Sequence, residues 1–308
     1  MHPITALMSA LGVLTAIYIA GWTRAVMAVR SLGSREPTPS TDARFPNPIQ
    51  IAIGAVTNFF DALGIGSFAT TTAMFRFLKM VPDRVIPGTL NAGHALPTIA
   101  QAFIFTSLIP VDIVTLFSMI AAAVAGAWFG AGVISRWSKK KVQFGMGLAL
   151  LAAATFFTMR QLGLFPEGSA EIGVRGAKLA IAVVGNFALG ALMTLGIGLY
   201  APCMILVSLL GMSERTAFPI MMNSCAFLMP IGSLRFIREQ SYSLRAALGL
   251  AIGGIPGVLL AAYIVKEMDL VKIRWLVIVV VVYTAATLLY SAFSEKDEPA
   301  AGQAKGTL

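Results

Sequence analysis

Apolar segments of membrane-spanning length recur along almost the whole chain, and they restrict it to folds that can sit in a lipid bilayer. Of the 308 residues, 57% are hydrophobic and 12% are charged, whereas soluble domains are about one-quarter charged. A helix needs roughly 20 apolar residues to cross a bilayer. We therefore expect an all-α integral membrane protein that has the lipid bilayer as a partner and has no separate soluble domain.

The basic residues indicate membrane topology rather than nucleic-acid binding. The formal net charge is +9, but the lysines and arginines sit in short loops between apolar segments, where they mark cytoplasmic loops. We expect no nucleic-acid partner and a multi-pass location in the cell (inner) membrane. The first apolar segment is too long and too lightly charged at its start to be a cleaved signal peptide, so we interpret it as a retained helix.

The sequence offers little sign of cofactor or metal chemistry. It contains no nucleotide-binding loop and no metal-ligand cluster, so we expect no cofactor and no metal. Cys203 and Cys225 lie in apolar segments, where cysteine usually behaves as a small hydrophobic residue, although a thiol could contact a sulfur-containing substrate. Nothing in the sequence indicates an oligomeric state.

The apolar segment at residues 49–80 is interrupted by a polar stretch. Asp61 precedes Gly64 and Gly66, and Ser67 and Thr70 follow them. Inside a membrane every backbone N–H and C=O needs a partner, so a broken segment is tolerated only where it is buried in protein or lines a cavity. Discontinuous helices form the substrate sites of many secondary transporters. This stretch is therefore the first candidate for a substrate site.

The same pattern returns 132 residues later. Aligning residues 63–91 with residues 195–223 without a gap gives nine identities in 29 positions. They include both break glycines, a proline and an asparagine, whereas chance similarity between apolar segments would favour leucine and alanine. We interpret this as an internal duplication.

Positive charge predicts that both interrupted segments are re-entrant, which means that each enters and leaves the membrane on the same side. In that arrangement 16 of the 23 lysines and arginines lie on the cytoplasmic side and 7 outside, whereas the split is 11 to 12 if both segments cross. About 14 residues flank each break, which is enough helix to reach the bilayer midplane. Each copy then contains one hairpin and three spans, so the two repeats are inverted.

We divide the chain into an N-terminal transmembrane helix, a cytoplasmic connector, a first repeat, a loop, a second (inverted) repeat and a polar tail. These parts are residues 1–30, 31–48, 49–162, 163–176, 177–293 and 294–308. Seven full spans are expected beside the two hairpins, at residues 4–29, 87–107, 111–134, 142–159, 216–236, 244–265 and 271–293. Gly126 and Gly130, spaced four apart, suit close helix packing.

The paired glycine breaks, each followed by a short helix and a proline-containing span, resemble the TauE/SafE sulfite exporter family, also called the toluene sulfonate uptake permease family. The motifs that carry the resemblance are Gly64-Ile65-Gly66-Ser67 with Pro87 and Asn91, and Gly196-Ile197-Gly198 with Pro202, Pro219 and Asn223. The resemblance covers about residues 48–293 and implies a secondary transporter of small sulfur-containing or organic anions, such as sulfite and sulfonates. Ser67 and the Thr70-Thr71-Thr72 run depart from the family's glycine-rich turn, which leaves the particular anion and the direction of transport open.

The breaks suggest how an anion could be held without a cationic side chain. Each hairpin brings the N-terminus of a half-helix to the midplane, where unpaired N–H groups and the helix dipole attract negative charge. The alternative is that the glycines only permit tight packing. The predicted substrate-binding residues are Gly64, Gly66, Ser67, Thr70 and Asn91 in the first copy, and Gly196, Gly198, Leu199, Tyr200 and Asn223 in the second.

Two ionisable residues at membrane depth are candidates for proton coupling. Asp61 and His94 have no ionisable counterparts in the second copy, where Met193 and Ala226 stand, and intramembrane ionisable residues are functional candidates by default. The alternative is a purely structural role, such as capping. Asn91 and Asn223 could likewise either contact substrate or satisfy backbone carbonyls.

Secondary anion transport is the leading hypothesis, and two rivals remain beside it. A passive anion channel would share the same site but not depend on a proton gradient. An intramembrane enzyme would need a nucleophile and a base, for which Ser67 and His94 could serve. Because the hairpins are duplicated and His94 is not, we do not expect an enzyme.

Overall fold

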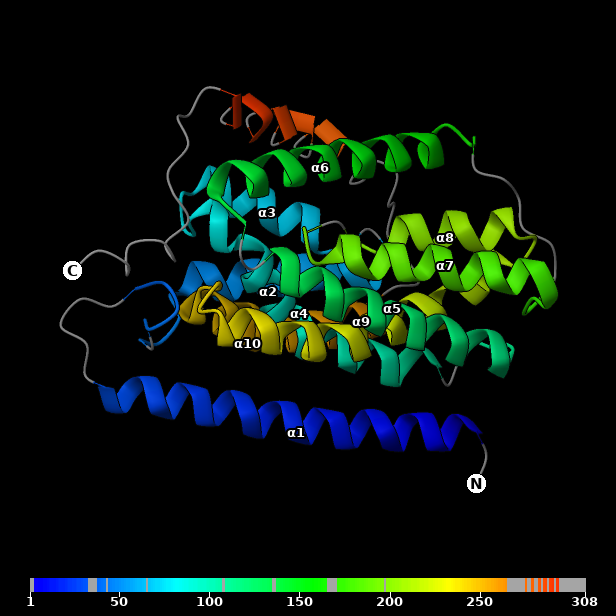
Figure 1. The fold of residues 1–308 in the computed structure, drawn as a ribbon, viewed down its shortest axis with the longest axis horizontal. Coiled ribbons are helices and arrows are strands. Elements are labelled where there is room, and N and C mark those ends of the chain that lie inside the picture. The colour runs from blue at the N-terminus through cyan, green and yellow to red at the C-terminus, as the bar shows by residue number, and fades with distance from the viewer. Residues whose placement is uncertain are drawn as a thin grey trace.

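The computed structural model is a bundle of helices with one long helix along its edge (Figure 1). It describes residues 3–32, 38–42, 44–64, 66–106, 109–134, 137–164, 171–196, 198–264 and scattered residues between 275 and 293, and these contain helices but no named strand. The predicted span 271–293 lies largely outside the described residues, as do the tail and parts of the connector and of the loop 163–176. The helices are α1 (Pro3–Leu32), α2 (Pro48–Ala62), α3 (Phe68–Phe77), a short 3-10 helix η1 (Asp83–Val85), α4 (Ile86–Thr106), α5 (Ile113–Ile134), α6 (Lys139–Gln161), α7 (Gly176–Met193), α8 (Tyr200–Leu209), α9 (Glu214–Arg238) and α10 (Leu244–Ile264).

The helix breaks predicted from the glycines are present. One lies between α2 and α3, where Gly64 and Gly66 have φ angles of 79° and 87°, and the other lies between α7 and α8, where Gly196 has a φ of 95°. These are left-handed conformations that glycine adopts without the steric cost of a Cβ atom. α7 has 18 residues, about 27 Å of helix, so it is longer than the expected flank of about 14 residues.

The elements follow the same order in the two halves, and each half packs on the other. α2 lies against α10, and α7 lies against α5. The helix before the first break is therefore packed on the second half of the chain, and the helix before the second break is packed on the first half. A methyl group built on Gly253 of α10 would lie 1.9 Å from the Ile51 carbonyl oxygen of α2. This contact requires glycine, because the two backbones touch.

The α5–α7 contact is built in the same way. A methyl group on Gly126 would lie 2.0 Å from the Phe187 carbonyl oxygen, and one on Gly130 would lie 2.7 Å from the Ala191 carbonyl oxygen. The prediction that Gly126 and Gly130 serve close helix packing is therefore confirmed. Small residues at such contacts bring helices close enough to gain van der Waals energy in the absence of a hydrophobic driving force between them.

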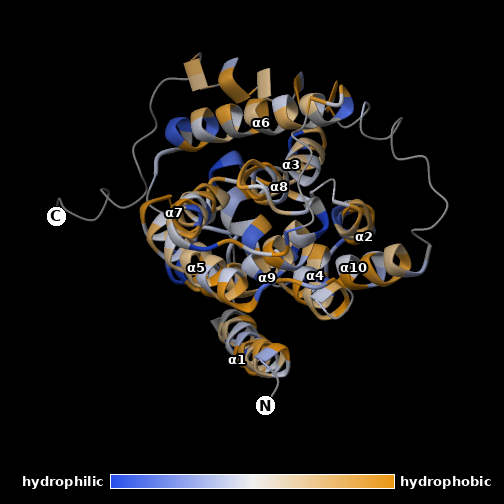
Figure 2. Cartoon of the chain, turned by 90° about the vertical axis from the view of Figure 1, so that its right-hand side faces the viewer, coloured by the Kyte–Doolittle hydropathy of each residue, from blue (hydrophilic) through white to orange (hydrophobic). Residues whose placement is uncertain are grey.

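Five described helices are long and apolar enough to cross a membrane, at Pro3–Ala28, Ile113–Ile134, Gly176–Met193, Arg215–Arg238 and Leu244–Tyr263. These support an integral membrane protein. The seven spans predicted from the sequence include α4 and α6 but not α7, which is treated there as the first arm of a hairpin. α4 is buried inside the bundle and carries the buried polar residues His94 and Gln101, so its sides face protein. Figure 2 shows hydrophilic segments in the interior, while α1, α5 and α10 are largely hydrophobic.

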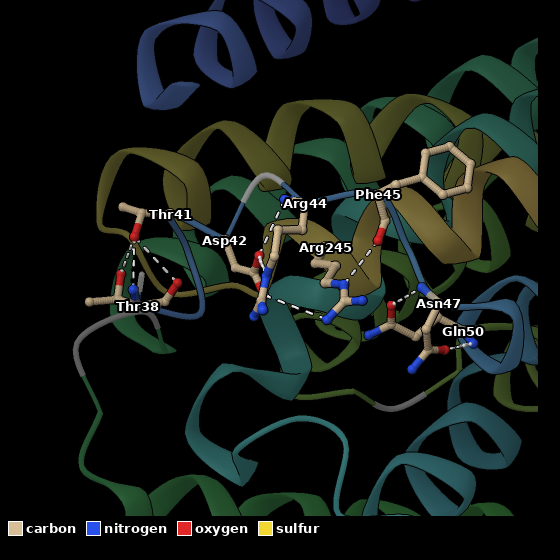
Figure 3. A network of polar contacts seen from close by, with 8 residues as sticks. All are labelled: Thr38, Thr41, Asp42, Arg44, Phe45, Asn47, Gln50 and Arg245. Carbon is tan, nitrogen blue, oxygen red and sulfur yellow. Dashed lines mark hydrogen bonds and ion pairs between the residues drawn. The ribbon is translucent and has the colours of Figure 1, made fainter. Parts of the chain in front are cut away.

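Hydrogen bonds gather the loops at the two ends of the bundle. At one end the Leu244 amide donates to the Pro39 carbonyl (3.0 Å) and the Ser243 amide donates to the Thr89 hydroxyl (2.8 Å). The segment before α2 and the start of α4 therefore meet the same α9–α10 loop. Figure 3 shows the neighbouring contacts, in which Arg245 donates to the Phe45 carbonyl.

The start of α2 is fixed by its sequence. Asn47 accepts a hydrogen bond from the Gln50 amide (2.8 Å), and the Gln50 side chain accepts one from the Asn47 amide (3.1 Å; Figure 3). This capping box satisfies amides that the helix itself leaves free. Just before this cap, the amide and side chain of Arg44 donate three hydrogen bonds to Asp42.

At the other end, the segments before α7 and after α8 are joined. Glu171 and Met212 form an isolated parallel bridge, and the Ser213 amide donates to the Glu171 carbonyl (2.8 Å). The chain thus starts and finishes the α7–α8 unit at the same end of the bundle. Arg175 adds a two-pronged contact to Asp112, with nitrogen–oxygen distances of 2.6 and 2.7 Å.

The Asp112–Arg175 contact predicts a pH-dependent contribution to stability. Hydrogen bonds from Arg175 hold the pKa of the Asp112 carboxyl well below its usual range. A lowered pKa stabilises the fold above the unfolded-state value of about 4, and that stability is lost as the pH falls through the lower folded-state value. Arg175→Met should therefore lower the melting temperature at pH 7 slightly, since the arginine is 60% exposed, and the difference from wild type should shrink below about pH 4.

The measurement is thermal unfolding of the detergent-purified protein at several pH values. Arg215→Met, at the same end of the bundle, is the matched control for loss of a positive charge. An equal effect of both substitutions at every pH would contradict the assignment.

Candidate functional site

The two helix breaks meet at one small buried cavity, which is the candidate functional site. Its lining includes residues from both breaks and from the helices between them: Asp61, Gly66, Ser67, Phe68, Thr98, Met193, Gly198, Leu199, Tyr200, Cys225 and Met229. The cavity volume is about 10 Å³, close to the smallest space that holds a single water molecule. A larger ligand can enter only if the breaks move apart, so this conformation is a closed one.

Asp61 lies at the centre of the polar contacts in this cavity. One of its oxygens accepts a hydrogen bond from the Ser67 amide (2.6 Å), and the other accepts one from the Gln101 side-chain nitrogen (2.7 Å). The carboxylate therefore sits at the N-terminus of α3, where the helix dipole favours negative charge. The amide of Ser67, predicted to bind the substrate anion, is bonded to the protein's own carboxylate in this conformation.

Gln101 connects the first break to the second. Its side-chain nitrogen bonds Asp61, while its side-chain oxygen accepts a hydrogen bond from the Tyr200 hydroxyl (2.7 Å). Asp61, Gln101 and Tyr200 thus form a continuous chain from the end of α2, through α4, to the start of α8. The sequence analysis did not select Gln101 as a site residue. The sequence does hold a sign of its role: Gln101 follows His94 by seven residues, which places the two side chains on nearly the same face of one helix.

The second break differs from the first because it has no carboxylate. Met193 occupies the position that corresponds to Asp61. Within the described residues, no hydrogen-bond partner is found for the amides of Gly198, Leu199 and Tyr200 at the start of α8. The N-terminus of α8 is therefore not bonded to a protein carboxylate in the described residues, unlike the Ser67 amide at the start of α3. Cys225, from α9, also lines the cavity and contacts the Met193 sulfur at 3.6 Å.

His94 belongs to a separate network and does not bond Asp61. Its Nδ1 lies 3.1 Å from the Asn58 side-chain oxygen, and its Nε2 lies 3.0 Å from the Thr71 hydroxyl. Because the Asn58 oxygen can only accept, Nδ1 carries the proton and Nε2 accepts from Thr71, as in a neutral imidazole. Phe68, which lines the cavity, also contacts this network, with its ring centroid 5.7 Å from that of His94.

The remaining predicted residues lie around the cavity rather than in it. The Thr70 hydroxyl donates to the Ser67 carbonyl (2.9 Å), and Gly64 and Gly196 shape the turns. Asn91 donates to the Pro87 carbonyl (2.9 Å), and Asn223 donates to the Pro219 carbonyl (2.7 Å) and to the Thr106 hydroxyl. The two asparagines thus make the backbone contacts that were the alternative to substrate binding.

No family model, curated protein or solved structure matches this chain. The resemblance to the TauE/SafE family therefore stays a prediction from the sequence motifs. In the described part of the chain, no group of three or more histidine, cysteine and acidic side chains is placed to hold a metal ion.

The His94 network predicts strong coupling between Asn58 and His94. Replacing Asn58 by alanine leaves the buried Nδ1–H of His94 without a partner, which should cost about 1–3 kcal/mol of unfolding free energy. Once His94 is also replaced by alanine, much of that cost should disappear, since there is no longer a stranded donor. A double-mutant cycle measured by denaturant unfolding in detergent should give a coupling energy of roughly 0.5–3 kcal/mol.

Thr70→Val is the control for this cycle, because the Thr70 hydroxyl bonds only backbone within its own turn. If the effects of the Asn58 and His94 substitutions simply add, the two side chains do not depend on one another and the proposed tautomer is wrong.

Proposed function

We propose that this protein is a secondary transporter that moves a small sulfur-containing or organic anion, of the sulfite and sulfonate class, across the cytoplasmic membrane. The observation that carries the proposal is that both glycine-marked breaks line one buried cavity. Duplicated discontinuous helices that meet at a common site are typical of transporters that alternate access to that site. The resemblance to the TauE/SafE family supplies the substrate class.

The chemistry of the cavity favours an anion held by oriented backbone amides. No lysine or arginine is among the described residues that line it. A charge at this depth needs compensation, and the free amides at the start of α8, together with its dipole, are the available source. The Ser67 amide becomes a second source once Asp61 releases it.

Re-entrant, inverted repeats are part of the proposal. The Glu171–Met212 bridge supports them, because it ties the segment before α7 to the segment after α8. In the first half, the segment before α2 and the start of α4 both bond the α9–α10 loop. If these two ends face opposite sides of the membrane, opening of one break or the other would expose the cavity to one side at a time.

The rival hypotheses have less support. A channel would need a path that stays open, whereas the cavity is closed to about 10 Å³. An intramembrane enzyme would use His94 as the base for Ser67, whereas His94 bonds Thr71 and Asn58. A thermal-shift screen of the purified protein against sulfite, thiosulfate, sulfonates and carboxylates tests the proposal, since a bound anion stabilises the folded state. Absence of stabilisation by every anion would count against it.

Gly198 and Gly66 offer a pair of substitutions with different predicted effects. A methyl group on Gly198 would meet nothing closer than the Phe68 Cβ atom at 4.0 Å, so Gly198→Ala should fold normally while filling the cavity. We expect it to weaken thiosulfate or methanesulfonate binding at least about tenfold, or 1.4 kcal/mol. Gly66→Ala should instead destabilise the protein by about 1–2 kcal/mol because of its left-handed backbone.

Gly232→Ala is the matched control, because a methyl group there also meets only an ordinary contact, to Ala127 at 3.9 Å. Binding is measured by titration calorimetry and stability by thermal unfolding. Wild-type anion affinity in Gly198→Ala would argue against a site at the α8 terminus.

Cysteine labelling tests the re-entrant topology. Pro39 and Leu78 are exposed and lie before α2 and after α3, whereas the adjacent Ser40 is only 5% exposed and would be a poor reporter. In a background without Cys203 and Cys225, a membrane-impermeant maleimide should label Pro39→Cys and Leu78→Cys from the same side, and Ile172→Cys from the other. Labelling of the first two from opposite sides would rule out the hairpin.

A further inference from the structure

We infer that the Asp61–Gln101–Tyr200 chain is a proton-operated switch, in which protonation of Asp61 turns the Tyr200 hydroxyl toward the substrate anion at the second break. This inference rests on the proposed function and assigns the coupling mechanism to that same site. Gln101 and Tyr200 then take part in coupling proton uptake to anion binding. His94 has no part in that proton coupling.

The two hydrogen bonds that Asp61 accepts from nitrogen suit an ionised carboxylate. Both of its oxygens are acceptors, one from the Ser67 amide and the other from the Gln101 side-chain nitrogen. Neither of these nitrogens can accept a hydrogen bond. A protonated Asp61 cannot donate to either nitrogen, so its proton needs an oxygen acceptor, and the Gln101 side-chain oxygen lies on the residue that already contacts the carboxyl.

Gln101 can present that oxygen by turning its side-chain amide over. Its oxygen then accepts from the protonated Asp61, and its nitrogen donates to the Tyr200 oxygen, since a tyrosine hydroxyl can either donate or accept. In the observed state the Tyr200 hydrogen is committed to the Gln101 oxygen at 2.7 Å. After the turn that hydrogen is free to point into the cavity that Tyr200 lines.

The consequence is that a proton and an anion favour the same state of the site. An ionised Asp61 occupies the Ser67 amide, repels an incoming anion and holds the Tyr200 hydrogen away from it. A neutral Asp61 no longer repels the anion, weakens its hold on the Ser67 amide and presents the Tyr200 hydroxyl beside the free amides of α8. Binding of one anion is therefore linked to uptake of one proton, and the pair can cross with less net charge than the anion alone.

The other titratable groups around the cavity leave Asp61 as the switch. Tyr200 from α8 and Cys225 from α9 line the cavity with it, while α7 contributes Met193 and α4 contributes Thr98. His94 on α4 faces Asn58 and Thr71 instead. Of the described residues that line the cavity, Asp61 is the one carboxylic acid.

The test measures anion affinity between pH 5 and 8 by titration calorimetry. Methanesulfonate and thiosulfate are the probes because both stay ionised over this range, whereas sulfite itself titrates. Wild-type affinity should rise as the pH falls, by up to about tenfold per pH unit for one linked proton. Asp61→Asn mimics the neutral acid, so it should bind about as tightly at pH 8 as wild type does at pH 5, without pH dependence.

Tyr200→Phe separates the switch from a simple contact. It should weaken binding at pH 5 and have little effect at pH 8, where the Tyr200 hydrogen is held by Gln101. Tyr18→Phe is the matched control, since that hydroxyl donates to the Ala92 carbonyl, away from the cavity. Asp112→Asn is the control for loss of a carboxylate, because Arg175 keeps the pKa of Asp112 well below the range tested.

A second readout needs no variant. Adding anion to the wild-type protein in weakly buffered solution at pH 7 should consume up to one proton per anion bound. The inference is overturned if no proton is taken up, if Asp61→Asn keeps the wild-type pH dependence, or if Tyr200→Phe weakens binding by the same factor at pH 5 and pH 8. If the wild-type protein binds neither probe at any pH and is stabilised by no anion of the thermal-shift screen, the proposed function fails, and the switch fails with it.

Discussion

A helix that stops inside a membrane leaves backbone amides without partners, and the rest of this structure depends on how two such stops are accommodated. Water is not available there to satisfy the free groups. At the first break the protein supplies a carboxylate, Asp61, which bonds the Ser67 amide. At the second break, within the described residues, it supplies nothing equivalent. Two breaks that line the same cavity therefore differ at the N-cap, where the Ser67 amide is bonded to a protein carboxylate and the corresponding Leu199 amide is not.

The packing of the bundle follows from the need to hold both breaks against each other. Gly253 and Gly126 let α10 and α5 touch the backbones of α2 and α7, so the helix before each break is clamped by the other half of the chain. α4 and α9 then fill the centre, and their polar side chains face protein rather than lipid. For this reason α4 carries His94 and Gln101 without a cost in lipid exposure.

Much of this arrangement follows from the sequence, but the pairing of side chains does not. Gly64, Gly66 and Gly196 predict the breaks because few other residues adopt their backbone angles, and the spacing of Gly126 and Gly130 predicts a close helix contact. The partners of Asp61 and His94 depend on how α4 is rotated between α2 and α8, which single-helix periodicity does not specify. The sequence therefore predicts Asp61 and His94 together as proton-coupling candidates, whereas in the structure Asp61 bonds Gln101 and His94 bonds Asn58 and Thr71. The number of spans stays a prediction, because the five helices that are long and apolar enough to cross do not include α4, whose buried polar residues lower its hydropathy.

The duplication and its imperfection have different physical consequences. Two similar halves that clamp each other can exchange conformations, which is what alternating access needs. Two halves with a carboxylate at each break would place a protein anion at both helix ends, and two halves with a methionine there would lack the group that takes up the proton. Met193 stands in the second copy at the position that corresponds to Asp61, so only the first break has a carboxylate. The repeat thus provides two conformations that can exchange. Because only one copy carries the carboxylate, binding of the anion depends on whether Asp61 is protonated.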